Sequence, residues 1–317
     1  MMEVLVKSKD VIADDICMFE LASANDDALP PFSAGAHVDV KMPNGITRQY
    51  SLCNHPSENH RYQIAVLKDP ASRGGSVAMH QQINIGDRIE ISEPKNLFPL
   101  AHDAKRTLLF AGGIGITPIL CMAERLAHTG ADFELHYCTR SPAKTAFMQR
   151  IQASAFADRV HFHFDDGDAA QKLDAASVLA APQSDTHLYV CGPNGFMEHV
   201  LETAQTQGWP AAQLHREYFS AAPVNHADDD SFDVQISSTG QIIHVPADKT
   251  VIEALEAFDI EIPFSCESGM CGTCLTRVLD GVPDHKDVFL TEEEQAKNDQ
   301  FTPCCSRAKS AQLVLDI

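Results

Sequence analysis

The chain has 317 residues, of which 44% are hydrophobic and 21% charged, so it is long enough for two or three ordinary folded domains. Its formal net charge of −20 argues against a nucleic-acid partner, because no basic surface is available to neutralise phosphates. The sequence contains no run of about 18 apolar residues, and its polar N-terminus lacks the apolar stretch of a signal peptide. We therefore expect a cytoplasmic protein that binds neither nucleic acid nor a membrane.

Residues 1–102 predict a small antiparallel barrel. Short alternating segments, such as 36–42 and 62–67, are separated by turns rich in Pro, Gly and Asn. The only helix expected in this block is brief and covers residues 77–82.

Residues 103–224 predict a doubly wound parallel α/β domain, because apolar runs alternate with helical patterns. The expected strands cover 107–111, 133–138, 160–164 and 187–191, and the expected helices cover 117–128, 144–153 and 196–207. A polar linker over 225–231 follows. The last block, 232–317, predicts two short strands, a helix over 250–258, a cysteine cluster and a closing strand over 313–317.

The cysteines near the C-terminus carry the first functional signal. Cys266, Cys271 and Cys274 have the spacing C-x4-C-x2-C, which plant-type [2Fe–2S] ferredoxins use. A structural zinc site is the alternative, but it favours two C-x2-C pairs and only one is present here. The fourth ligand is Cys304 or Cys305, since only one of two adjacent residues in an extended segment points inward. The residues alone leave that choice open.

Residues 107–118, T-L-L-F-A-G-G-I-G-I-T-P, predict a strand that runs into a glycine turn and then a helix. Such a turn lets backbone amides approach a pyrophosphate, with Thr117 suited to the N-cap and Pro118 to the first helical position. A second turn of this kind contains Cys191, Gly192 and Pro193. We expect both turns at the carboxyl edge of one parallel sheet, where ligands bind. A plain tight turn is the alternative for either one alone.

Residues 48–54, R-Q-Y-S-L-C-N, suggest a flavin site on a barrel strand. Arg48 and Tyr50 share one face of a strand, so that the guanidinium can pair with a phosphate while the phenol lies beside a flavin ring. Ser51 can hydrogen-bond to either part. A second phosphate cradle is indicated by R-G-G-S-V at 73–77. Taken in isolation, the R-x-Y-S segment favours the ordinary interpretation, in which Arg48 is a surface charge and Tyr50 a core aromatic.

The fixed order of these motifs resembles the phthalate dioxygenase reductase family. The order is R-x-Y-S, G-G-S, G-G-I-G-I-T-P, C-G-P, H-x-E-x-F and C-x4-C-x2-C with a later cysteine. The resemblance covers essentially the whole chain. It implies an antiparallel flavin-binding β-barrel at 1–102, an NAD-binding domain at 103–224, the linker at 225–231 and a C-terminal β-grasp ferredoxin domain at 232–317.

The resemblance also implies a set of cofactor-binding residues. For FMN they are Arg48, Tyr50, Ser51, Val66, Leu67 and Lys68, with Gly74, Gly75 and Ser76 at its phosphate. For the nicotinamide nucleotide they are Gly113, Thr117, Cys191, Gly192 and Pro193. Glu217 is expected to tune the flavin and Phe219 to cover its ring. The resemblance selects Cys304 as the fourth cluster ligand beside Cys266, Cys271 and Cys274.

The function that the resemblance implies is electron transfer from NADH through FMN and the [2Fe–2S] cluster to a separate Rieske-type oxygenase, by a monomeric reductase. The residues leave FAD open in place of FMN. They also leave NADPH open, because Thr139, Arg140 and Ser141 follow the second strand where an acidic residue would hold a ribose hydroxyl. No residue is assigned to acid–base catalysis.

Two alternatives change the partner or the class of protein. In the first, the same redox chain serves a cytochrome P450 or a di-iron hydroxylase. In the second, the chain is a [2Fe–2S] redox sensor without turnover, which leaves the R-Q-Y-S and G-G-I-G-I-T-P segments without a role.

Overall fold

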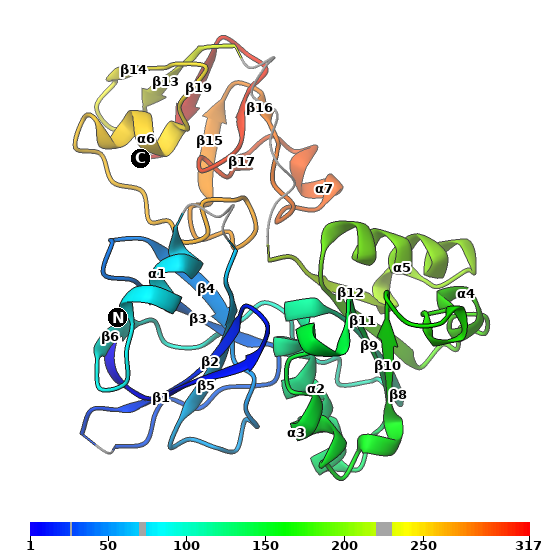
Figure 1. Ribbon diagram of the computed structural model, residues 1–317. Helices are drawn as coiled ribbons and strands as arrows, with labels where there is room; N and C mark the ends of the chain where they lie inside the picture. The colour runs from blue at the N-terminus through cyan, green and yellow to red at the C-terminus, as the bar shows by residue number, and fades with distance from the viewer. Residues whose placement is uncertain (26, 70–73, 220–229) are drawn as a thin grey trace. The chain divides into compact units, whose positions relative to one another are not determined.

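The computed structural model describes residues 1–25, 27–69, 74–219 and 230–317. Its chain divides into two compact units, Met1–Phe219 and Ser220–Ile317. The first unit contains an antiparallel barrel and a parallel sheet, and the second contains a mixed sheet with one helix across it (Figure 1). Among the described residues, no helix is long and apolar enough to cross a bilayer.

The barrel is built from seven strands in the order β4-β3-β6-β1-β2-β5, with β7 paired to β3. Every pairing is antiparallel, and a bridge between Leu52 and Ile64 joins the β4 and β5 edges, which closes the sheet. The strands are β1 (Met2–Ala13), β2 (Ile16–Ser23), β3 (Ala36–Lys41), β4 (Thr47–Ser51), β5 (Tyr62–Leu67), β6 (Arg88–Ile91) and β7 (Lys95–Asn96). The brief predicted helix is confirmed as α1 (Gly75–Gln82).

The parallel sheet has the order β10-β9-β8-β11-β12, and all of its pairings are parallel. The strands are β8 (Arg106–Gly112), β9 (Asp132–Thr139), β10 (Val160–Phe164), β11 (Thr186–Cys191) and β12 (Leu214–Glu217). The helices are α2 (Ile116–Thr129), α3 (Met148–Gln152), α4 (Ala175–Val178) and α5 (Asn194–Thr206). Short 3₁₀ helices cover Gly113–Gly115, Pro142–Lys144, Ala157–Arg159, Ala169–Gln171 and Ala211–Gln213.

Alternating residues of β8 show why helices cover both faces of this sheet. Leu109 and Ala111 join the core formed with α2, whereas Leu108 and Phe110 join the core formed with α4 and α5. Both faces of the strand are therefore apolar, which confirms the doubly wound prediction.

The predicted helix over 144–153 was too long. The structure places Lys144 in a 3₁₀ turn, and Phe147 has a left-handed backbone with φ 60°, so α3 begins only at Met148. Thr145 holds the turn in place through hydrogen bonds to the Ser141 carbonyl (2.9 Å) and the Thr139 hydroxyl (2.7 Å). These side-chain bonds compete with the helical pattern.

The barrel and the parallel sheet share one core. Ile16, Cys53, Ala65 and Phe98 of the barrel pack in the same buried cluster as the α2 side chains. Arg150 adds a polar link, donating to Glu124 at 2.7 Å and to the Gln63 amide oxygen at 3.1 Å. The predicted boundary after residue 102 thus lies inside the first compact unit, and the division into domains at this position stays a prediction.

The second unit has a mixed sheet of the order β14-β13-β19-β15-β17, in which only β13 and β19 run parallel. The strands of this sheet are β13 (Phe232–Ile236), β14 (Ile242–Val245), β15 (Thr276–Asp280), β17 (Gln300–Phe301) and β19 (Gln312–Leu315). A separate two-stranded antiparallel sheet is formed by β16 (Pro283–Asp284) and β18 (Arg307–Ala308). The unit also has two helices. Its helices are α6 (Val251–Glu256) and α7 (Glu292–Gln295). Thr250 and Glu253 form a capping box at α6, which fixes the start of the predicted helix. Most of the predicted linker, 225–229, lies outside the described residues.

Candidate functional site

The predicted FMN-phosphate residues meet at the start of α1. A Cβ atom on Gly75 would lie 2.9 Å from Cγ of Arg48, so this side chain passes directly over the glycine. Gly74 precedes the helix with φ 98°, a conformation that favours glycine. A guanidinium beside a helix N-terminus presents positive charge and backbone N–H groups to the same point. This pair of features fits a phosphate group.

Other predicted flavin residues lie on the barrel strands next to α1. Tyr50, on β4, is half-buried against the barrel core, and this burial raises the pKa of its phenol. The carbonyl of Val66 lies 2.8 Å from His80 Nε2, which ties β5 to α1. Leu67 is exposed, and the Lys68 amide donates to the Asp15 carbonyl at 2.7 Å. Helix α1 therefore connects the two strands that carry these residues.

Ser51 and Glu217 join the barrel to the parallel sheet. Ser51 ends β4, and its hydroxyl donates to Oε2 of Glu217 at 3.3 Å. Glu217 ends β12 directly beside Cys191 at the end of β11. Glu217 is partly exposed as a residue, but its carboxyl group is surrounded by protein. Loss of solvation of the charged form raises the pKa of this carboxyl from 4.5 to about 8. The carboxyl is thus largely protonated at neutral pH and stands between the predicted flavin and nucleotide residues.

The two glycine turns pack backbone against backbone. A Cβ atom on Gly115 would collide with the Cys191 carbonyl and lie 2.6 Å from the Gly192 amide nitrogen, and one on Gly192 would lie 2.9 Å from Cα of Gly112. Strands β8 and β11 are neighbours in the sheet, so the turns at their carboxyl ends meet, as the sequence predicted. Open space lies over Gly113, which has φ 54°.

The prediction that Thr117 is the N-cap of the following helix was wrong. Helix α2 begins at Ile116 after a 3₁₀ turn, with Gly115 as its N-cap. The Thr117 hydroxyl donates to the Ile114 carbonyl at 3.1 Å and is buried. The tight packing of Gly115 on Cys191 allows the helix to start earlier than the Thr-Pro pair suggested.

Two acidic residues at the carboxyl edge escaped the sequence analysis. The amide of Asp165 donates to the Thr139 carbonyl at 3.0 Å, and that of Asp166 donates to the Arg140 carbonyl at 3.1 Å. The parallel pairing of β10 with β9 therefore places two exposed carboxylate residues beside the end of the second strand. The signal in the sequence was the pair D-D directly after the strand at 160–164.

The four predicted cluster ligands are buried together in the second unit. Thiol contacts with Cys271 and Cys304 lower the pKa of Cys266, and contacts with Cys266 and Cys274 raise that of Cys304. Backbone amides point at the sulfurs: Gly269 N lies 3.3 Å from Sγ of Cys304, and Met270 N lies 3.4 Å from Sγ of Cys266. Four buried thiols with amide donors fit a [2Fe–2S] cluster.

Cys305 contacts Cys304, lies against Gly269 of the cysteine loop, and has two hydroxyl neighbours. Its sulfur lies 3.3 Å from the Thr302 hydroxyl and 3.9 Å from the Ser306 hydroxyl. The Cys304 sulfur contacts Cys266 and Cys274, whereas among the predicted ligands the Cys305 sulfur contacts only Cys304. This geometry favours Cys304 as the fourth ligand.

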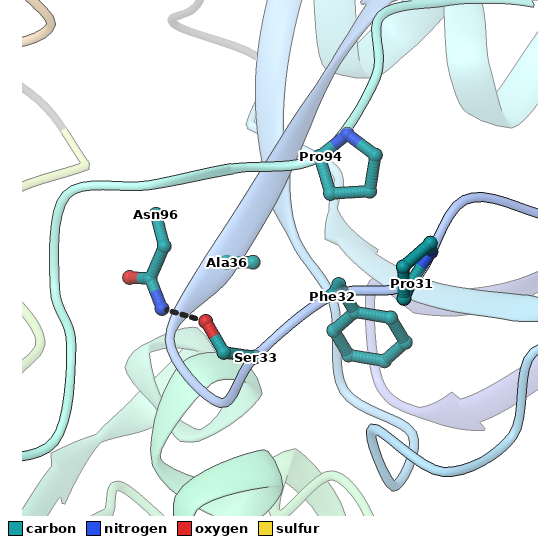
Figure 2. A pocket seen from close by; sticks show the side chains of 6 residues that line it. All are labelled: Pro31, Phe32, Ser33, Ala36, Pro94 and Asn96. Carbon is teal, nitrogen blue, oxygen red and sulfur yellow. Dashed lines mark hydrogen bonds between the residues drawn. The ribbon is translucent and has the colours of Figure 1, made fainter.

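One small pocket on the barrel is separate from these residues. It is a shallow hollow of about 290 Å³, and two of its lining residues are hydrogen-bonded, with Asn96 donating to the Ser33 hydroxyl at 2.7 Å (Figure 2). The lining residues are Pro31, Phe32, Ser33, Ala36, Pro94 and Asn96, and they include none of the predicted site residues.

Three family models match the chain. Residues 3–99 match an oxidoreductase FAD-binding domain, and residues 234–309 match a 2Fe-2S iron-sulfur cluster binding domain. Residues 92–214 match the N-terminal domain of dimethylamine monooxygenase subunit DmmA-like proteins. Together with the geometry above, these matches define the class of protein: an oxidoreductase that transfers electrons between a flavin and a [2Fe–2S] cluster.

The particular family follows from full-length relatives. The chain is 62% identical to a vanillate O-demethylase oxidoreductase of Pseudomonas putida over 100% of both chains, and 42% identical to phthalate dioxygenase reductase of Burkholderia cepacia over 98% and 96%. The solved structure of a phthalate dioxygenase reductase matches with a TM-score of 0.80 and 41% identity, covering 100% of this chain and 98% of that one. The chain belongs to the phthalate dioxygenase reductase family, and the resemblance inferred from the motifs is confirmed.

The contact between the glycine turns predicts a specific effect of Gly115→Ala. The added Cβ would separate the turns, so we expect reduction of the bound flavin by NADH to slow by at least about tenfold. Stopped-flow absorbance measures this rate. Gly195→Ala is the matched control, because no heavy atom lies within 4 Å of a Cβ there. An unchanged rate in G115A would contradict the importance of this contact.

The raised pKa of Glu217 predicts a pH-dependent stability difference from Glu217→Gln. The folded protein keeps a proton that the unfolded chain releases, in the window between pH 4.5 and about pH 8. The free energy of unfolding of the wild type should therefore fall relative to that of E217Q by about 1.4 kcal/mol per pH unit in this window, and the difference should level off above it. Urea unfolding at a series of pH values measures this. Glu198→Gln, an exposed glutamate of α5, is the control, and parallel curves for wild type and E217Q would refute the prediction.

The two adjacent cysteines should respond differently to substitution. Cys305→Ser should retain about two irons per chain, and Cys304→Ser should lose them, because the Cys304 sulfur contacts both Cys266 and Cys274 and the Cys305 sulfur contacts neither. Iron analysis and the visible spectrum of the anaerobically purified variants decide between them. Iron retained in C304S and lost in C305S would reverse the assignment.

Proposed function

We propose that this protein is the NADH-dependent reductase component of a two-component Rieske non-haem iron oxygenase that demethylates an aromatic methyl ether of the vanillate type. The observation that carries the proposal is the identity of 62% and 60% to two vanillate O-demethylase oxidoreductases, each over the full length of both chains. The oxygenase would be a separate protein, and the reductase would act as a monomer in the cytoplasm.

We assign FMN to the barrel on the geometry at the start of α1. Arg48, Gly74, Gly75 and Ser76 would hold its phosphate, because the guanidinium and the helix N-terminus converge there. The ring would lie along Tyr50, Ser51 and the segment Val66–Lys68, with Phe219 over it.

The nucleotide would lie on the contact between the two glycine turns. The open space over Gly113 leaves room for a pyrophosphate, and Thr117, Gly192 and Pro193 border the same edge of the sheet. The Cys191 side chain is fully buried in the core, so this residue would support the nicotinamide site through its backbone turn. The neighbouring Glu217 has a neutral carboxyl that keeps a negative charge away from the reacting rings at neutral pH.

The bound cofactors convert the two-electron donor NADH into single electrons for the acceptor. The residues of the chain would position these groups relative to one another. Cys266, Cys271, Cys274 and Cys304 would hold the [2Fe–2S] cluster, and no protein group is required to act as a general acid or base.

A cytochrome P450 is the second candidate acceptor. A type IV self-sufficient cytochrome P450 monooxygenase matches with a TM-score of 0.85 and 38% identity, where this chain covers 41% of that protein. The vanillate relatives are far closer in sequence over their whole length, so we rank the aromatic oxygenase first.

The redox chain is tested by anaerobic spectroscopy of the purified protein. We expect about one FMN and two irons per chain, with flavin and cluster absorbance both bleached by NADH. Formaldehyde release from vanillate, in the presence of the oxygenase component of the Pseudomonas putida vanillate O-demethylase, then tests the acceptor. Iron without flavin, or no bleaching, would exclude the reductase function. Bleaching without formaldehyde would exclude only the vanillate-type oxygenase.

The acidic pair beside β9 predicts the choice of coenzyme. We propose that Asp165 and Asp166 repel the 2′-phosphate of NADPH and offer acceptors to the ribose hydroxyls of NADH. The double variant Asp165→Ser/Asp166→Ser should lower the ratio of kcat/KM for NADH to that for NADPH by at least about tenfold. Asp158→Ser, at the opposite end of β10, should leave the ratio unchanged. An unaltered ratio in the double variant would assign selectivity to other residues.

A further inference from the structure

A segment of the second unit covers the cysteine loop. The Val288 amide donates to the Gly269 carbonyl at 3.1 Å, and the ring of Phe289 lies over Gly272. The segment is anchored by Asp287, whose buried carboxylate accepts from the Leu290 amide at 2.8 Å. Residues 287–290 therefore form part of the wall around the predicted cluster.

Large apolar side chains remain exposed around this loop. Phe264 and Leu275 flank the cysteine loop in the sequence, and Val288 and Phe289 lie on the covering segment. Their exposed fractions are 40%, 37%, 44% and 37%, respectively. We call these four residues the apolar collar. Several exposed large apolar side chains close to a redox centre are typical of a surface that is covered by a partner.

Negative charge adjoins the apolar collar. Helix α7 follows the covering segment, and its residues Glu292 and Glu293 are exposed. Glu294 is instead held by Thr291 in a capping box. Within residues 264–275 and 287–296 the sequence contains five acidic residues and no Lys or Arg. Two lysines flank these ranges. Lys286 lies 3.9 Å from Asp284, with which it forms an ion pair, and Lys297 follows α7 and interacts with Glu294.

The charges of the two units indicate which kind of partner fits this surface. Residues 220–317 contain eighteen acidic and six basic residues, a net charge of −12, and residues 1–219 carry the remaining −8 of the total. Both parts of the chain are acidic, so neither complements an acidic rim. A separate protein with Lys and Arg around an apolar patch does complement it.

We propose that the apolar collar and the acidic residues of α7 form the docking surface for the oxygenase component, and that the oxygenase presents a basic rim around an apolar centre. This inference rests on the proposed function, because it requires a separate electron acceptor. Electrostatic attraction would speed the encounter, and the collar would place the acceptor close to the cluster.

Reversal of the exposed charges tests the surface. The variant Glu292→Lys/Glu293→Lys leaves the capping residues Thr291 and Glu294 intact. With the oxygenase component of the Pseudomonas putida vanillate O-demethylase as acceptor, its KM for the reductase should rise by about tenfold at low ionic strength and depend less on salt than that of the wild type. Val288→Ser should raise the KM without altering the salt dependence.

The matched control is Asp248→Lys/Glu256→Lys, which changes the net charge equally at exposed residues of the same unit. Glu256 ends α6, and α6 and α7 lie on opposite sides of the unit in Figure 1. The control should leave the KM within about twofold of wild type, since it spares the proposed surface.

A second readout separates this inference from the proposed function. Bleaching of the cluster by NADH and reduction of ferricyanide, which needs no protein docking, should be unchanged in both double variants. An unchanged KM in E292K/E293K would overturn the docking surface. Slower bleaching in that variant would also overturn it, because the surface would then face the flavin-binding unit. Failure of the wild type to bleach would instead refute the proposed function.

Discussion

The close approach of two backbone turns at one edge of the parallel sheet is the constraint on which the redox site depends. Gly115 lies against the Cys191 carbonyl with no room for a side chain, and a Cβ atom on Gly192 would lie 2.9 Å from Cα of Gly112. This contact fixes the ends of β8 and β11 beside each other, and the pairing of β11 with β12 places Cys191 next to Glu217. From there one hydrogen bond reaches Ser51 on the barrel. The predicted flavin and nucleotide residues therefore belong to one continuous structure.

The shared core between the barrel and helix α2 supports that arrangement. Side chains of both parts pack in one buried cluster, and Arg150 links Glu124 of α2 to Gln63 of β5. Hydride transfer between stacked rings tolerates little displacement, so a rigid connection between the two binding surfaces is what the chemistry requires. The second unit has its own core and its own cysteine site, which suits a carrier that must also meet a separate protein.

Two glycines shape the loop that carries the predicted cluster ligands. Gly269 and Gly272 have φ of 68° and 66°, which turns the chain sharply and directs amides toward sulfur. The same glycines leave space for the covering segment, since Phe289 lies over Gly272 and Asp287 over Gly269. Loop and covering segment thus depend on each other, and both contribute to the surface that we assign to the oxygenase.

The sequence by itself determined the class of each part of the chain. Periodicity and turn residues predicted the barrel, the parallel sheet and most helices, and cysteine spacing predicted the cluster, because these signals depend only on neighbours along the chain. Only the tertiary structure decided which distant residues meet. Ser51 and Glu217 come together because the barrel packs against the parallel sheet, and Asp165 and Asp166 reach the end of β9 through strand pairing. Cys304, which the motif resemblance had selected, has its sulfur beside Cys266 and Cys274. The start of α2 at Ile116 depends on the packing of Gly115 against Cys191, and the start of α3 at Met148 depends on the hydrogen bonds of the Thr145 side chain. The hydrophobic pattern of the sequence does not contain this information.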